Sequence, residues 1–368
     1  MGGALLPTNA TEFERCLADV CDFHQDVDGS VLGISRSKLI TRPPRFLPWL
    51  IEEYGLGELT PYVPNLYDLL DQGLQWQRIR GSVAAVDRGL QWLGLSVHFT
   101  PAWTERAWWN SFQLEFDQLP ERGNLEAIEA IVDLSKSLRS DFRRGVIGYD
   151  VGAMEANMSR LDECMLDFES GIPVTALGTL FSFGRTTEIN HVLTKEEGTL
   201  IGNWIDDFDE ELSWEKLDYP WDLANFPWCS VKKHERDILM AEWFQNRSLY
   251  LALRDPDNAL IGYRRCYTVA PVEQALEDVY SHCGNRFKPS KTGTMLFLAA
   301  RTDFRDVEDK QAASISLLVH GTPAEQTPPG KLWLGNDELT SGVEILKTPV
   351  DIPLRADVRE QFKILLRF

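Results

Sequence analysis

The sequence lacks the features that mark several common protein classes. Its six cysteines form no C-x-x-C pair, and their spacing fits neither a zinc ribbon nor a compact secreted scaffold, so we expect free thiols. No stretch approaches the roughly 18 uninterrupted apolar residues of a membrane-spanning helix. The N-terminus has neither a positively charged leader nor a long apolar core, which predicts folding in a cytoplasm.

Basic charge is also scarce. The chain has 37 Lys and Arg residues against 56 Asp and Glu residues, which gives a formal net charge of −19. Binding to nucleic acid requires a basic face that displaces counterions from the phosphates. The composition therefore argues against a nucleic-acid partner.

Recognisable catalytic and metal-binding motifs are missing as well. There is no G-x-S-x-G elbow and no H-E-x-x-H motif, and the six histidines have no second ligand three or four residues away. Arg80-Gly81-Ser82 precedes a predicted helix, but no G-x-G-x-x-G or Walker pattern surrounds it, so we interpret it as a helix start and not as a phosphate site. We expect no enzyme activity, no cofactor and no metal.

One segment leaves an enzymatic alternative open. Eight carboxylates and a single base, Lys216, lie between Asp206 and Asp222, inside a tryptophan-rich stretch that spans residues 204–228. Paired carboxylates beside aromatic rings are what a glycosidase uses, so a glycan-binding or glycan-hydrolysing protein is the alternative function. The candidates for such a pair are Asp206, Asp207, Asp209, Glu210, Glu211 and Asp222. A charge run between structured segments is more typical of a solvated loop or a docking segment.

The composition that is present is globular. At 368 residues, 43% of them hydrophobic, the chain has room for two or three domains, each with its own core. Twelve tryptophans supply large apolar surfaces with one donor each, which favours protein interfaces and sugar-binding surfaces alike.

The N-terminal 80 residues show helical periodicity. Asn9 or Thr11 is placed to cap a first helix, with Glu12 or Glu14 completing a capping box, and "DVDGS" at residues 26–30 predicts a turn after it. The positions that repeat at helical spacing in this first helix are Phe13, Cys16, Leu17, Val20, Cys21 and His24. Further helices are predicted near Pro48, over residues 65–79 with an Asn65 cap, and from Ser82 to Gly94. Short one-faced helices cannot cover each other completely, so we expect an intermolecular helical bundle.

The remaining segments predict an α+β fold. Strands over residues 95–101 and 111–117, a helix over 124–145 and a strand over 146–151 form a small module, and a separate β-rich domain follows. Within that domain we expect a helix in 231–255, another over 268–287, and several strands near the C-terminus. The predicted division is a bundle-forming region at 1–80, a small α+β module at 81–155 and a C-terminal α+β or β-rich domain at 156–368 that serves as a docking extension.

The order of several short motifs resembles the phage tail protein I family. These motifs are Leu5-Leu6-Pro7, Asn9-Ala10-Thr11, Glu14-Arg15, Leu47-Pro48-Trp49-Leu50, Arg80-Gly81-Ser82, the Trp108-Trp109 pair before "FQLEFD", and "KSLRSDF" at the end of a helix. The similarity covers residues 5–150, and the following 200 or so residues have no counterpart in it.

The resemblance implies a structural baseplate wedge subunit of a contractile phage tail or a related injection particle. Such a subunit joins two copies of a larger wedge protein in a heterotrimer and helps to couple fibre and receptor engagement to sheath contraction. The implied location is the tail baseplate of the virion, with assembly in the host cytoplasm. Neighbouring baseplate subunits, tail fibres or sheath-initiating proteins are further implied partners. The candidate interface residues are Phe13, Leu17, Val20, Trp49, Leu50, Tyr54, Trp76, Arg80, Gly81, Trp108, Trp109, Trp214 and Trp221.

Overall fold

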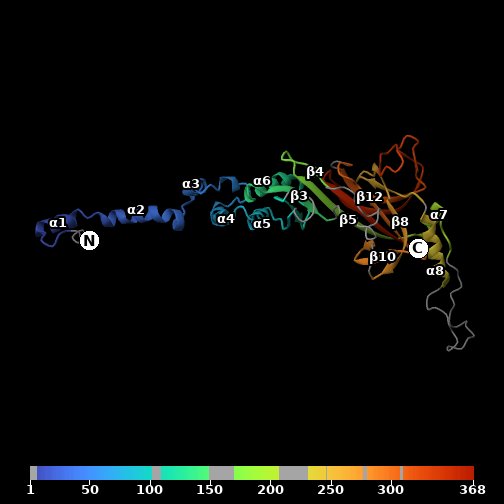
Figure 1. Ribbon diagram of the computed structural model, residues 1–368, viewed down its shortest axis with the longest axis horizontal. Coiled ribbons are helices and arrows are strands. Elements are labelled where there is room, and N and C mark those ends of the chain that lie inside the picture. The colour runs from blue at the N-terminus through green and yellow to red at the C-terminus, as the bar shows by residue number, and fades with distance from the viewer. Residues whose placement is uncertain are drawn as a thin grey trace, which may run out of the picture. The chain divides into compact units, whose positions relative to one another are not determined.

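The computed structural model describes residues 6–101, 109–148, 170–206, 231–245, 247–276, 280–306 and 310–368 (Figure 1). Contacts divide the chain into two compact units, one of residues 1–96 and 126–140 and the other of residues 97–125 and 141–368. Helices dominate the first unit and strands the second, which confirms the predicted α+β class. The division of the chain at residues 80 and 155 stays a prediction.

The first unit consists of short helices. They are α1 (Glu12–Val20), α2 (His24–Arg36), the π-helical η2 (Ser37–Thr41), η3 (Pro44–Phe46), α3 (Leu47–Glu53), η4 (Gly57–Leu59), α4 (Leu66–Ile79), α5 (Val83–Trp92) and nearly all of α6 (Leu125–Ser135). The helices α3 to α6 bury apolar side chains such as Leu50, Leu69, Leu90 and Ile131. In α1 no side chain is buried.

Two of the predicted helix caps, at the starts of α1 and α4, are confirmed. The backbone N–H of Thr11 donates to Glu14 Oε2 at 2.7 Å, and the backbone N–H of Glu14 donates to Thr11 Oγ1 at 3.3 Å, which together form a capping box. Asn65 Oδ1 accepts the backbone N–H of Tyr67 at 3.1 Å at the start of α4. Local hydrogen bonding thus sets both helix starts.

Two helix predictions are wrong. The expected turn at residues 26–30 lies inside α2. The helical segment is interrupted earlier, at residues 21–23 between α1 and α2, where Asp22 Oδ1 accepts the backbone N–H of His24 at 2.9 Å. A glycine inside a helix costs only about 1 kcal/mol, so Gly29 does not stop α2. The helix expected to reach residue 145 ends at Ser135, because residues 141–147 pair with two neighbouring strands as β3.

The second unit is built from β-strands. They are β1 (Val97–Pro101), β2 (Ser111–Phe116), β3 (Asp141–Ile147), β4 (Ile172–Pro173), β5 (Leu180–Val192), β6 (Tyr250–Arg254), β7 (Leu260–Arg265), β8 (Thr268–Ala275), β9 (Tyr280–His282), β10 (Asn285–Pro289), β11 (Met295–Arg301), β12 (Lys310–Val319), β13 (Thr322–Pro323), β14 (Trp333–Leu334), β15 (Leu339–Thr340), β16 (Val343–Leu354) and β17 (Val358–Arg367). The second unit also contains two helices, α7 (Lys195–Ile201) and α8 (Val231–Phe244).

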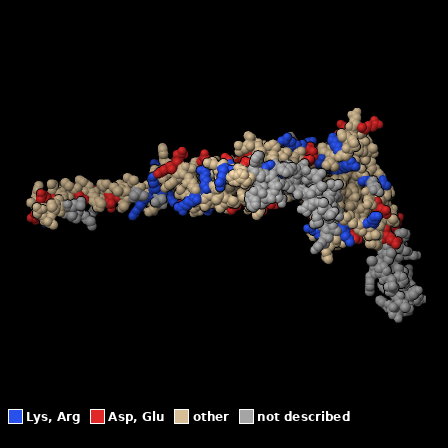
Figure 2. All heavy atoms as spheres, viewed as in Figure 1, with Lys and Arg blue, Asp and Glu red and all other residues tan. Residues whose placement is uncertain are grey.

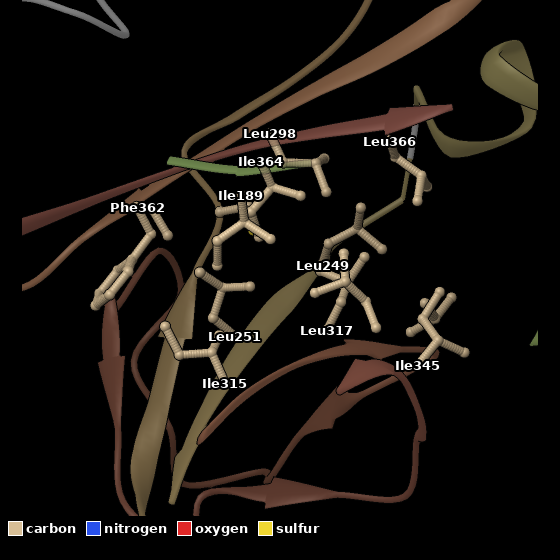
Figure 3. Close-up of a cluster of buried hydrophobic side chains, with 14 of the residues drawn as sticks. Ile189, Leu249, Leu251, Leu298, Ile315, Leu317, Ile345, Phe362, Ile364 and Leu366 are labelled. Atoms are coloured by element: carbon tan, nitrogen blue, oxygen red, sulfur yellow. The ribbon is translucent and has the colours of Figure 1, made fainter. Parts of the chain in front are cut away.

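Two sheets face each other across the main core. In the described residues, the ten-stranded sheet has the order β1-β2-β3-β5-β17-β11-β8-β10-β9 with β4 beside β5, and the five-stranded sheet has the order β14-β7-β6-β12-β16. Figure 3 shows Ile189, Leu298 and Ile364 of the first sheet pointing toward Leu251 and Leu317 of the second. Their packing makes this unit a β-sandwich.

The helix predicted over residues 268–287 is also wrong. Residues 268–275 form β8, which pairs with β10 on one side and β11 on the other, and residues 280–282 form β9. Pairing with strands that follow in the sequence decides the conformation here, which a local pattern does not reveal. The strands expected around residues 295–301, 313–319 and 362–368 are confirmed.

A single carboxylate joins α7 to two strands. Glu197 Oε1 accepts the backbone N–H of Leu346 in β16 at 2.8 Å, and Glu197 Oε2 lies 2.9 Å from His191 Nε2 in β5. Burial opposes ionisation of Glu197, but the N–H groups of Thr194 and Leu346, together with His191, outweigh it and hold the pKa of Glu197 below its usual value.

We predict that Glu197→Gln lowers the free energy of unfolding at pH 7 and that the difference from wild type shrinks toward pH 3. A carboxylate with a depressed folded-state pKa contributes stability above its unfolded pKa and loses it as the pH falls through the folded value. Urea unfolding across this pH range measures the difference. The exposed Glu196→Gln is the matched control. A difference that stays constant down to pH 3 contradicts the assignment.

Candidate interaction surface

A row of apolar side chains is exposed along α1 and α2. The exposed fractions are 74% for Phe13, 51% for Leu17, 77% for Val20, 50% for Val27, 56% for Val31 and 75% for Ile34. A folded chain normally turns such residues inward, and contiguous exposed apolar surface is typical of protein–protein contact sites. In Figure 2 the atoms of this segment that face the viewer are mostly uncharged.

The spacing of these residues is that of a helix-pairing face. Phe13, Leu17 and Val20 are separated by four and three residues within α1, and Val27, Val31 and Ile34 repeat the same spacing within α2. Residues separated by three and four positions lie on one side of a helix, and this alternation is the a/d pattern of heptads. We name the six residues the heptad rows.

The aromatic candidates and Leu50 fall into three groups. Trp49 in α3 and Trp109 before β2 are 71% and 70% exposed. Leu50 and Trp76 are buried in the first unit and Tyr54 is half-buried, so we leave these three out of the proposed surface. Trp108, Trp214 and Trp221 lie outside the described residues.

Arg80 and Gly81 tie the α4–α5 turn to the end of α6. Arg80 Nε donates to the carbonyl oxygen of Leu134 at 2.8 Å, and the backbone N–H of Gly81 donates to the carbonyl oxygen of Ser135 at 2.8 Å. Trp76 Nε1 also reaches Ser135, at Oγ, over 3.1 Å. Arg80 and Gly81 therefore stabilise the packing of the α4–α5 turn against α6 within the first unit.

The expected side-chain cap by Ser82 is replaced by another contact. Ser82 occupies the N-cap position of α5, but its hydroxyl donates backward to the carbonyl oxygen of Ile79 at 2.6 Å. The predicted helix end at Gly94 is confirmed by its left-handed φ of 73°.

The acidic segment considered for glycan chemistry lies largely outside the described residues. Of its six candidate carboxylates, the structure describes Asp206, whose Oδ1 lies 2.5 Å from Lys195 Nζ and accepts from Trp204 Nε1 at 3.0 Å. The hydrogen bond from Lys195 is the largest of the causes that lower the pKa of Asp206, which is an anion in an exposed ion pair. A buried acid suited to proton donation would have the opposite shift.

Neither a metal site nor a membrane-spanning helix emerges from the described residues. No group of three or more His, Cys, Asp or Glu side chains in the described ranges is arranged to hold an ion. Among the helices in those ranges, none is long and apolar enough to cross a membrane.

The comparison with protein families agrees with this picture. Residues 6–139 match the Phage tail protein (Tail_P2_I) family. The match includes the heptad rows and the Arg80-Gly81 turn, and it confirms the resemblance seen in the sequence. It supports a role as a structural component of a phage tail, in contact with other tail proteins. No curated protein matches the chain.

Part of the candidate surface escaped the sequence-based prediction. Val27, Val31 and Ile34 were missed because residues 26–30 were interpreted as a turn, although α2 runs through them. The signal was available, since the four-and-three spacing of α1 recurs after the break at residues 21–23.

We predict that Gly81→Ala destabilises the first unit by about 1–2 kcal/mol, because Gly81 has a φ of 88° that a Cβ makes unfavourable. Crowding is not the cause, since the nearest atoms to an added Cβ, both in Ser137, lie 3.9 Å away. Thermal unfolding monitored by helical circular dichroism measures the change. Gly33→Ala, in open space within α2, is the control that should leave stability unchanged or raised. Equal stability of Gly81→Ala and wild type refutes the assigned role.

Proposed function

We propose that this protein is a structural subunit of the baseplate wedge of a contractile phage tail. In this proposal α1 and α2 enter an intermolecular helical bundle with a larger wedge protein, present in two copies per wedge. The heptad rows carry the proposal, and the family match over residues 6–139 supports it. Coupling of fibre and receptor engagement to sheath contraction is the corresponding task of the assembled wedge.

The energetics favour association of these helices. Full burial of one Val, Leu, Ile or Phe side chain contributes roughly 1.5–3 kcal/mol, so six such side chains contribute on the order of 10 kcal/mol. Loss of translational and rotational freedom on binding opposes this with about 4–15 kcal/mol. The two terms are comparable, so a stable wedge needs contacts beyond the heptad rows. Exposed Trp49 and Trp109 are candidates for them.

Charge along the N-terminal segment constrains how a partner lies against it. Residues 12–28 contain six acidic side chains and one basic side chain, Arg15, whereas residues 29–51 contain four basic side chains and no acidic one. Opposite charges flanking a helix-pairing face set partner choice and orientation. A partner helix with basic residues beside 12–28 is therefore favoured, whereas Lys38 and Arg42 in the basic stretch already pair with Glu53 and Asp71 of this chain.

The second unit lies mostly beyond the family match and has its own core. We assign it contacts with neighbouring baseplate subunits or with tail fibres. An independent core suits this task, because an attachment domain must keep its shape before its partner arrives.

Coexpression with the larger wedge protein tests the bundle. We predict that Val31→Asp lowers copurification at least about tenfold, since a charge in an apolar contact leaves a desolvated group unpaired. Leu32→Asp is the matched control, because it adds the same charge one position away, outside the heptad rows, and should have a much smaller effect. Equal copurification of both variants with wild-type yield would overturn the proposed bundle.

A further inference from the structure

A pocket lies on the face of the five-stranded sheet that points away from the main core. Leu249, Leu251 and Leu253 turn toward that core, whereas Tyr250 turns to the opposite face. In register, Tyr250 of β6 stands opposite Arg265 of β7, so both side chains project from the same face. The segment 321–331 covers this face and leaves a cavity of about 320 Å³.

The floor and the outer wall of the pocket are apolar and held in place. Tyr250 and Leu334 are buried at the floor, and prolines at positions 323, 328 and 329 line the wall. Glu338 secures the wall by accepting from Lys331 Nζ at 2.5 Å and from the backbone N–H of Gly335 at 2.7 Å. The charge of Lys331 is therefore already balanced.

Two polar groups of this pocket have unused hydrogen-bonding capacity. Tyr250 lines the pocket, and no hydrogen bond of its hydroxyl is found within the part of the chain that the structure describes. Within the same ranges Arg265 has no carboxylate partner, and its contact is a long 3.4 Å bond from Nη2 to Ser248 Oγ. The adjacent Arg264 differs, because its Nη1 lies 2.9 Å from Asp306. A guanidinium without a carboxylate partner and a hydroxyl that line the same pocket favour an anionic ligand.

We propose that this pocket binds an acidic side chain, followed by an apolar one, from a partner polypeptide. The carboxylate pairs with Arg265 and accepts from the Tyr250 hydroxyl, and the apolar side chain packs against the prolines and Leu334. A sugar is disfavoured because the ring of Tyr250 is buried and offers no open face for stacking. The cavity volume is at the small end of ligand pockets, which suits one or two side chains.

Calorimetric titration of the full chain with two short peptides tests the site. N-acetyl-glutamyl-leucyl amide is expected to bind, and N-acetyl-glutaminyl-leucyl amide to bind about tenfold more weakly. Arg265→Gln should weaken the acidic peptide about tenfold and Tyr250→Phe about threefold, with the ring still filling the core. Arg286→Gln, an exposed arginine of β10 with the same change of charge, is the control and should bind as wild type.

Several results would overturn the proposal. They are the absence of saturable binding at millimolar acidic peptide, equal affinity for both peptides, and unchanged affinity in Arg265→Gln. Tighter binding of glucuronate than of the acidic peptide would also refute it, since it would assign the pocket to an acidic sugar. The outcome does not depend on the heptad rows, so the wedge proposal can fail while this site stands.

Discussion

Short helices in water need something to cover their apolar side. Isolated helices below about 12–15 residues are marginal, and α1 and α2 have 9 and 13 residues. The helices α3 to α6 satisfy this need inside the first unit by burying leucines and isoleucines against one another. The helices α1 and α2 keep their heptad rows exposed, so their stability and the proposed assembly role depend on the same missing contact.

The second unit has the opposite character. Its two sheets bury each other, and several of its buried arginines find carboxylates within the unit, such as Arg264 with Asp306 and Arg359 with Asp303. Charged side chains that are already paired within the unit do not need charges on a partner protein to balance them. The chain thus combines helices that expose apolar rows with a domain that has its own buried core, a division that suits the proposed role of a subunit that binds other chains through α1 and α2.

The features that could be predicted from the sequence are those that depend on contacts within a few residues. The Thr11–Glu14 capping box, the Asn65 cap and the glycine end of α5 follow from contacts within a few residues, and all were predictable. Residues 141–145 of β3 and all of β8 were not, because they take their conformation from pairing with other strands, β2 and β5 for β3 and β10 and β11 for β8. The pocket beside Arg265 has the same origin, since sheet pairing brings residues 248–265 under residues 321–334. Of the candidate surface, the row on α1 was predictable. The row on α2 was missed because residues 26–30, which contain Gly29, were interpreted as a turn.

Backbone amide hydrogen exchange over residues 12–36 tests the central claim most directly. It should be measured in the isolated chain and in the assembled tail. The account predicts fast exchange for α1 and α2 in the isolated chain, and protection of both helices in the assembly, because partner helices then cover the heptad rows. Exchange over this segment that is equally slow in both states, or equally fast in both, would contradict it.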